Sequence, residues 1–485
     1  MKKFIKSCLC LALAFTAVFS LTACKDKLSQ TTTDTSNVKT VNEVSTNGGM
    51  TVVHNDYLYF INGTKTNDGT SLTNNKRAAI CRVKYDVATG EVNKDTYEVV
   101  VSDLVGFKNA SLYFFGDFMY YATPSGAENY KGEVLYNKTR FMRYDLVNKK
   151  SHEIYTTVQN SAEEVVSYSY FIVSNTLNLV VYEKTNATIT SLKIDDEVST
   201  NYVISEVSSC VMSENFGTCV TAGKTVDANN FVFYTLAHEL TDSIQTGVKV
   251  YRTSPVSNTS ELICNNGEEV SLLAIRNGKL LYSVDDIVYA SAIESTRKDL
   301  TFTLQNIISY LTYENVIFME NEDGSISLLS YNKDTYQVVV FTWKNGVEIE
   351  NNTINVLSKA EKFEFVTLAT IDEVVVEDDE ETTDVDETKT EKVQFLVYIA
   401  DSIIYKLEVA RENSQGKLEL VKHTQPIKLS ATKVESSNGL LIPEVIGNYL
   451  FVMAQDDNKI VYMHKIDMSV KETSTDKATF IGIAE

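Results

Sequence analysis

A short run of aromatic and aliphatic residues recurs along the chain, usually directly after a turn residue. The eight copies are residues 55–60, 116–121, 178–182, 230–234, 278–282, 315–319, 394–398 and 447–451. These runs are short and rich in Tyr, Val, Ile and Phe, and no extended stretch of the chain has a helical period. Each run therefore predicts a buried β-strand.

A second kind of element follows most copies. In residues 80–86, 141–146 and 461–467, apolar and polar side chains alternate, which is the period of a strand with one buried face. Turn-forming residues come next, for example at 86–90 and 332–334. The pattern thus predicts pairs of strands joined by tight turns.

The strand pairs recur about every 50 to 60 residues, which is the spacing of a repeat protein. On period and strand character the chain resembles a β-propeller, although the Trp-Asp signatures of some propeller families are absent. That resemblance implies an all-β fold over residues 47–485, with seven or eight four-stranded blades stacked around an axis. Stacking of blades buries sheet faces that one blade alone would expose. Tandem β-sandwiches are the alternative architecture.

The longest interval between pairs contains an acidic segment. Residues 377–387 carry eight Asp or Glu side chains and no basic one, and apolar runs flank them on both sides. We expect a solvated loop insertion at about 377–392 between two strands of one blade. Calcium loops need a glycine at their bend, and this segment has none, so the pattern does not favour a metal site.

The first residues predict export. Lys2, Lys3 and Lys6 precede an apolar run that is too short to span a membrane, as in a secretory signal. Residues 21–24 (Leu-Thr-Ala-Cys) resemble the lipobox of bacterial lipoproteins. The resemblance implies a signal peptide at 1–23, cleavage after Ala23 and a diacylglycerol on Cys24. Residues 24–46 are polar and poor in large apolar side chains, which predicts a lipidated flexible tether.

Charge narrows the range of partners. The formal net charge is -21, and loss of the three signal lysines makes it -24. A body this acidic should avoid nucleic acid, whose backbone is also negative. The predicted location is the extracytoplasmic face of the cell membrane. The expected partners are the membrane, through the anchor, and an envelope protein or glycan.

Cysteine chemistry leaves two readings open. Cys210 and Cys219 are close in sequence and could form a disulfide in an exported compartment, or all four body cysteines could be buried thiols. The state of the other two, Cys81 and Cys264, is not fixed by the sequence.

Known catalytic motifs are incomplete in this chain. Residues 217–225 resemble a phosphate-binding loop with wrong spacing, and residues 238–242 begin like a zinc-protease helix but end in Asp242 where a second histidine is needed. No serine-hydrolase elbow occurs. We therefore predict no catalytic residue, no metal ligand and no cofactor.

These observations favour a membrane-anchored propeller that acts as a binding or scaffolding module. The abundant Tyr side chains and Trp343 could stack on a sugar or a protein partner, but they fit a blade core equally well. A cell-surface enzyme acting on glycans is the main alternative, since paired carboxylates can come together only in three dimensions. An accessory or sensor subunit of an envelope complex is the third hypothesis.

Overall fold

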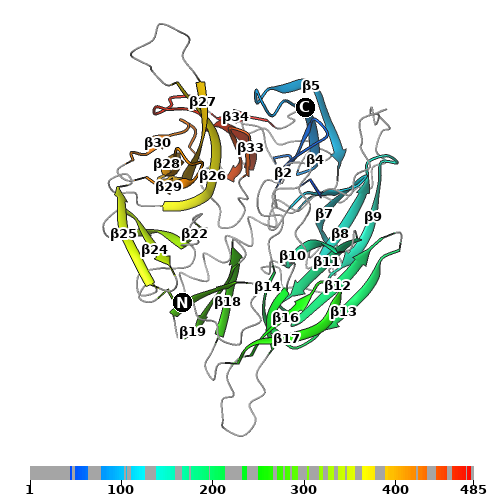
Figure 1. Cartoon of the computed structure of the whole chain (residues 1–485). Coiled ribbons are helices and arrows are strands. Elements are labelled where there is room, and N and C mark those ends of the chain that lie inside the picture. Colours follow the sequence, from blue (N-terminus) through cyan, green and yellow to red (C-terminus); the bar gives the residue numbers. More distant parts are fainter. Residues whose placement is uncertain are drawn as a thin grey trace, which may run out of the picture.

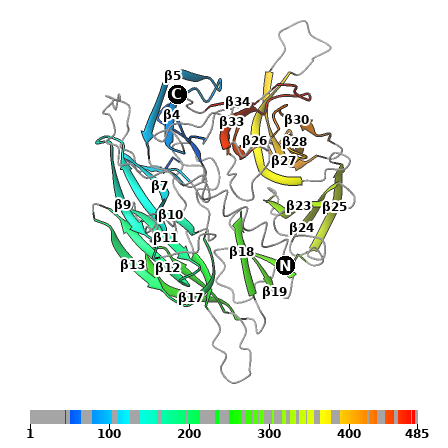
Figure 2. The same ribbon diagram turned by 180° about the vertical axis from the view of Figure 1, so that it is seen from behind.

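The computed structural model is a β-propeller with eight sheets in a ring (Figure 1), seen from behind in Figure 2. Every regular element in the part of the chain that the structure describes is a strand. The prediction of an all-β propeller is confirmed, and the tandem-sandwich alternative is wrong. The structure describes residues 44–45, 50–63, 78–102, 105, 111–125, 138–158, 166–173, 176–195, 197–212, 232–236, 249–265, 270–276, 279–284, 287–292, 303–304, 316–320, 326–332, 337–344, 347–355, 363–376, 388–421, 424–433, 444–455, 461–476 and 478–481.

Each sheet is one blade, and its first to fourth strands follow one another along the chain; in blade 2 these are β6 to β9, with β1 added beside β6. Blade 1 contains β2 (Thr51–His54), β3 (Tyr57–Ile61), β4 (Ile80–Tyr85) and β5 (Val92–Val101). Blade 2 contains β1 (Val44–Ser45), β6 (Tyr113–Phe115), β7 (Phe118–Ser125), β8 (Lys138–Asp145) and β9 (Lys150–Thr156). Blade 3 contains β10 (Ser167–Val173), β11 (Thr176–Glu183), β12 (Thr188–Ile194) and β13 (Ser199–Ile204). Blade 4 contains β14 (Val207–Met212), β15 (Val232–Leu236), β16 (Lys249–Ser254) and β17 (Ser257–Asn265).

The second half of the chain builds four more blades. Blade 5 contains β18 (Val270–Arg276), β19 (Lys279–Val284), β20 (Ile287–Ala292) and β21 (Thr303–Leu304). Blade 6 contains β22 (Val316–Glu320), β23 (Ile326–Asn332), β24 (Gln337–Lys344) and β25 (Val347–Asn355). Blade 7 contains β26 (Phe363–Val376), β27 (Thr388–Ala400), β28 (Ile403–Glu412), β29 (Leu418–Leu420) and β30 (Ile427–Lys428). Blade 8 contains β31 (Glu444–Ile446), β32 (Tyr449–Gln455), β33 (Val461–Asp467) and β34 (Thr479–Phe480).

The recurring apolar run is the second strand of seven blades. In blade 6 it falls instead on the first strand, β22, and the next strand in sequence, β23, is the second. Consecutive strands near the ring axis are both apolar, so hydrophobicity alone cannot distinguish the first from the second.

The strand order divides the connections between two faces of the ring. The turn face holds the links from first to second and from third to fourth strands, such as 55–56, 86–91, 116–117, 146–149 and 447–448. The crossover face holds the remaining links. Three blades repeat one backbone bond on the turn face, in which an amide just after or at the end of the third strand donates to a carbonyl of the first turn. These bonds are Tyr85–Asp56 (3.0 Å), Leu146–Asp117 (3.0 Å) and Met468–Asn448 (2.9 Å).

A second repeat joins neighbouring blades, and we call it the latch. A cation on the third strand lies over an aromatic ring on the second strand and donates to a carbonyl that follows the third strand of the next blade. Lys406 lies 4.1 Å from the Phe395 ring centre and donates to Met468 O at 2.6 Å. Arg143 lies 4.8 Å from the Phe118 ring and donates to Asp195 O at 2.9 Å. Each cation stands opposite the residue two positions after its aromatic partner.

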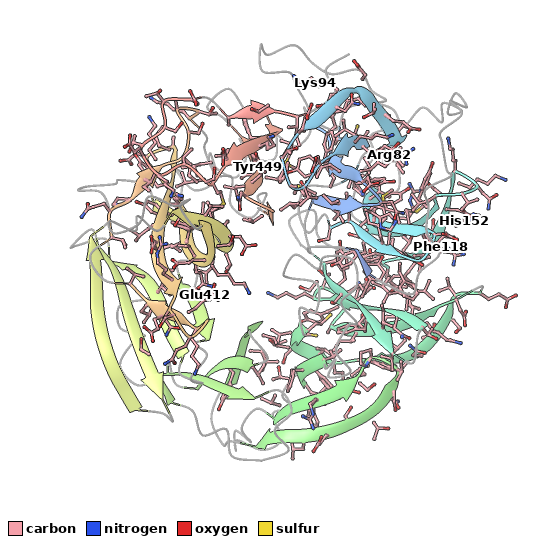
Figure 3. The ribbon with its side chains drawn as sticks, turned by 45° about the horizontal axis from the view of Figure 1, so that its top comes forward. Arg82, Lys94, Phe118, His152, Glu412 and Tyr449 are labelled. Carbon is pink, nitrogen blue, oxygen red and sulfur yellow. The ribbon has the colours of Figure 1, made fainter. Side chains whose placement is uncertain are left out.

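The same latch closes the ring between blade 8 and blade 1. Lys465 lies 4.4 Å from the Tyr449 ring and donates to Gly90 O, while Tyr449 Oη donates to Thr89 O at 2.8 Å. The two blades are each built from one continuous segment, so side chains and turns, rather than an exchanged strand, make this contact. Phe118, Arg82 and Tyr449 mark three neighbouring blades in Figure 3.

Blade 1 departs from the latch pattern. Arg82 lies 4.4 Å from the Tyr57 ring, as the pattern requires, but it binds within its own blade. Its guanidinium donates to Tyr59 Oη at 3.1 Å and to Glu98 Oε2 at 2.9 Å. In blade 1, therefore, a tyrosine and a glutamate accept the hydrogen bonds that a carbonyl of the next blade accepts elsewhere.

Replacing Gly90 by alanine should test the closing contact. Gly90 has a φ of +68°, and a Cβ there would lie 2.0 Å from Tyr449 Cε2. We expect Gly90→Ala to lower the free energy of unfolding by about 3 kcal/mol, from the positive φ and from displacement of Tyr449. Urea denaturation of the purified variant and wild-type chains measures this.

Gly416→Ala is the matched control, because Gly416 has a φ of +77° and its Cβ would meet only Glu412 Oε1 at 3.5 Å. The control should lose about 1 kcal/mol. Equal losses in the two variants would show that the Tyr449 contact does not stabilise the ring.

Candidate functional site

The feature that most distinguishes one blade from the others is an extension of β26 and β27. These strands pair from Phe363 with Ala400 to Val376 with Thr388, with one register shift between Phe365 and Thr367. The third strand of the blade, β28, follows β27 only as far as the pair Val393–Arg411. A two-stranded ribbon, 372–376 with 388–392, therefore extends past the rest of the sheet (Figure 1). We call this ribbon the arm.

The arm carries the acidic segment that the sequence singled out. Residues 377–387 connect its two strands and lie outside the described residues. The last five residues of the expected loop, 388–392, are strand instead. They contain little apolar surface, so no hydrophobic period predicts them as strand, and pairing with 372–376 supplies the ladder that fixes them.

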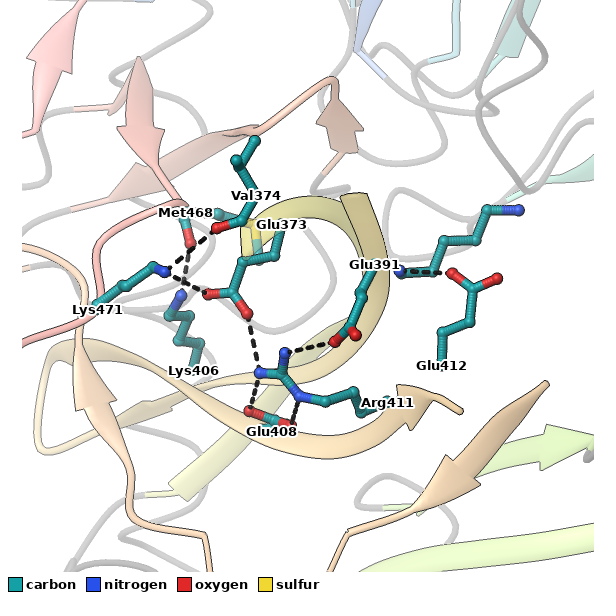
Figure 4. Close-up of polar contacts among 10 residues, drawn as sticks. Glu373, Val374, Glu391, Lys406, Glu408, Arg411, Glu412, Met468 and Lys471 are labelled. Atoms are coloured by element: carbon teal, nitrogen blue, oxygen red, sulfur yellow. Dashed lines mark hydrogen bonds and ion pairs between the residues drawn. The ribbon is translucent and has the colours of Figure 1, made fainter. Parts of the chain in front are cut away.

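Three glutamates meet one arginine at the foot of the arm (Figure 4). Glu373 and Glu391 stand directly opposite each other on β26 and β27. Arg411 of β28 contacts Glu373 at 2.8 Å and Glu391 at 3.3 Å, and it forms two bonds with Glu408 at 2.7 and 3.0 Å. The hydrogen bonds that Arg411 donates to Glu408, together with the charge of that carboxylate, raise the pKa of Arg411. Like charges opposite each other weaken a strand pair, and the guanidinium offsets that repulsion.

Blade 8 supports the same foot from the side. Lys471 Nζ lies 3.9 Å from Glu373 Oε1 and donates to Val374 O at 3.4 Å. Lys406, which forms the latch to Met468, is almost fully buried next to this group. Burial lowers the pKa of Lys406 to about 8. The arm is therefore held by its own blade and by the next one.

A side chain also ends the ladder at the base of the arm. Glu412 Oε2 accepts a hydrogen bond from the Lys392 amide at 2.8 Å, in the place where a further strand residue of β28 would pair. Without that carboxylate the amide would face water or an incoming strand.

The chemistry of this cluster is that of a brace. Each of the three carboxylates contacts the Arg411 guanidinium, and such charge-assisted hydrogen bonds are strong. Among the described residues, no group of three or more His, Cys, Asp or Glu side chains is placed to hold a metal ion. The cluster holds a charged ribbon in place.

The other residues singled out in the sequence do not join this cluster. Cys24 and Cys219 lie outside the described residues, as do the motifs at 217–225 and 238–242. Cys210 lies on β14, and because Cys219 lies outside the described residues, the disulfide between them stays a prediction. Cys81 is a buried cysteine on β4. Neither the side chain of Cys264, on β17, nor that of Trp343, on β24, is among those described.

The aromatic residues serve the core and the latches. Tyr59, Tyr121, Tyr170, Tyr282 and Tyr398 are among the largest fully buried side chains. Phe118 and Tyr449 belong to latches, and they are only partly buried. Within the described part of the chain, no helix is long and apolar enough to cross a membrane.

Comparison with known proteins gives only distant likenesses. No protein-family model matches the chain, and no curated protein matches it. A putative 6-phosphogluconolactonase from Bacteroides fragilis is 14% identical with a TM-score of 0.32, over 93% of this chain and 100% of that one. The periplasmic gluconolactonase of Pseudomonas aeruginosa is 11% identical with a TM-score of 0.32, over 74% and 98%. A post-proline cleaving enzyme from Rickettsia typhi is 11% identical with a TM-score of 0.36, over 89% and 58%. These likenesses give the chain neither a family nor an activity.

Arg411→Met should loosen the arm. The substitution leaves Glu373 and Glu391 opposed without a cation between them, so the ribbon should open more often. We expect amide hydrogen exchange in 372–376 and 388–392 to become about tenfold faster, measured by mass spectrometry.

The matched control is Lys193→Met, which removes an exposed lysine paired to Asp195 at 2.5 Å on another blade. Exchange in the arm should not change in that variant. Unchanged exchange in Arg411→Met as well would mean that the guanidinium does not hold the arm.

The depressed pKa of Lys406 predicts a dependence of stability on pH. Between pH 8 and 10.5 the unfolded chain binds a proton at this lysine that the folded chain does not, so stability should rise with pH over that window. The Lys406→Met variant lacks this term. Between pH 8 and 10 the free energy of unfolding of the wild type should therefore rise relative to that of the variant, so the variant becomes the less stable of the two by comparison. Urea denaturation at each pH measures this difference. Parallel pH curves for the two chains would contradict the burial of a charged lysine.

Proposed function

We propose that this chain is a lipoprotein held on the extracytoplasmic face of a membrane by Cys24, and that its propeller is a binding or scaffolding module. In this proposal the arm of blade 7 is the contact point for an envelope partner. The observation that carries it is the braced ribbon. An isolated pair of strands is only marginally stable in water, so the four side chains of the brace serve to hold the ribbon out from its blade.

The surface of the arm supports the same role. Val374 is 55% exposed on a ribbon whose other described residues are mostly charged or polar. An apolar side chain within a polar rim is a common arrangement at a protein contact. The Arg411 cluster argues against the glycan-acting alternative at this place, because its carboxylates are committed to a cation.

Site-specific crosslinking tests this proposal. A photoreactive amino acid replaces Val374 in the full chain, expressed in its own host and irradiated in intact cells. A crosslink to one discrete envelope protein or glycan is the expected result, because the arm is the predicted contact point. The matched control replaces Val203, which is 54% exposed on β13, and should give no such product.

Two results would contradict the proposal. One is identical products from the two positions, which would mean non-specific capture. The other is no product at Val374 together with cleavage of cell-wall glycans by the purified chain, which would favour the enzyme.

A further inference from the structure

The start of the folded chain enters the ring from a definite side. β1 pairs antiparallel with β6, the first strand of blade 2, in the register Val44–Phe115 and Ser45–Phe114. Phe115 directly precedes the turn at 116–117, which belongs to the turn face. The end of β1 that leads back toward Cys24 therefore lies at the turn face, and the other end leads toward the crossover face and β2.

Exposed apolar side chains gather on the same face. Of the seven large apolar residues that the described part of the chain exposes, five lie on the turn face. Four occupy or adjoin the turns after the third strands of blades 1 to 4, and the fifth is on the arm. They are Val87, Val147, Val198, Val256 and Val374. The two others, Val158 and Val203, follow or end a fourth strand and lie toward the crossover face.

The length of chain between Cys24 and β1 limits which face of the ring can lie toward the membrane. Nineteen residues lie between Cys24 and Val44, so the two are twenty residue steps apart. This segment can span at most about 70 Å when fully extended, and a relaxed chain of that length spans about 25 Å. A compact body of about 440 residues has a radius of gyration near 22 Å, which corresponds to a sphere of about 28 Å radius. The length of its strands adds about 20 Å from one face of the ring to the other. Passing around the rim would therefore stretch the segment to about twice its relaxed span.

We propose that the turn face lies against the membrane that holds the anchor, with the valine-bearing turns at the lipid headgroups. This inference rests on the proposed anchoring at Cys24. Acidic residues begin several of the same turns, as at Asp86, Asp145 and Asp195. They oppose adhesion to anionic lipids, so the anchor brings the face to the surface and the turns rest on zwitterionic headgroups.

Fluorescence quenching in vesicles tests the orientation. The lipidated full chain is reconstituted in phosphatidylcholine vesicles that contain a headgroup-labelled nitroxide lipid. A click-reactive amino acid that carries a fluorophore replaces Val147 or Val256 on the turn face, or Val158 or Val203 toward the crossover face. All four positions are exposed, so the substitutions should leave the fold intact. Quenching at the first two positions should exceed quenching at the last two by at least threefold.

Flotation of the vesicles separates the two ways to fail. The wild-type chain should float with the vesicles, and Cys24→Ala should stay behind and lose all quenching. If the wild-type chain floats but quenching is equal or reversed between the two pairs of positions, the orientation is wrong while the anchoring stands. If Cys24 carries no lipid and the wild-type chain does not float, the proposed anchoring is wrong and the orientation with it.

Discussion

The latch between neighbouring blades is the interaction on which the rest of the molecule depends. A ring of sheets is stable only if its last blade recognises its first, and here no exchanged strand joins them. Lys465 and Tyr449 make that contact by reaching the turn that contains Thr89 and Gly90. Gly447, with a φ of +58°, lets the two turns approach until its Cβ position is 2.9 Å from Val87 O. Two glycines in left-handed conformations thus permit the approach that a ring of eight blades requires.

The latch also explains why aromatic and basic residues recur together. A lysine removed from water needs replacement partners for its charge. The ring of the preceding strand and the carbonyl of the next blade supply two, as Phe395 and Met468 do for Lys406. Since the carbonyl belongs to the next blade, each latch sets the angle between two sheets as well as stabilising one. The abundance of aromatic residues is therefore in part a consequence of assembling a ring, without reference to any ligand.

Sequence periodicity predicted the strands well, because a buried strand needs a continuous apolar run and a turn after it. Periodicity does not predict which strand of a blade comes first, and at β22 and β23 the recurring run is the first strand rather than the second. The sequence does not predict the contacts among Glu373, Glu391 and Arg411, for a different reason. Glu373 lies 18 residues before Glu391, which lies 20 residues before Arg411, and only the pairing register of three strands brings them together. Nothing in the composition of 388–392 fixes that register.

Closure and the arm are linked through the geometry of one face. A rigid ring keeps the entry of β1, the turns of blades 1 to 4 and the arm of blade 7 in a constant relation. Lys471 of blade 8 supports the arm, and Lys465 of the same blade closes the ring. The arm and the closing latch therefore share blade 8 as a support. The latch acts together with a hydrophobic cluster that packs residues of blades 1, 2 and 8 against one another.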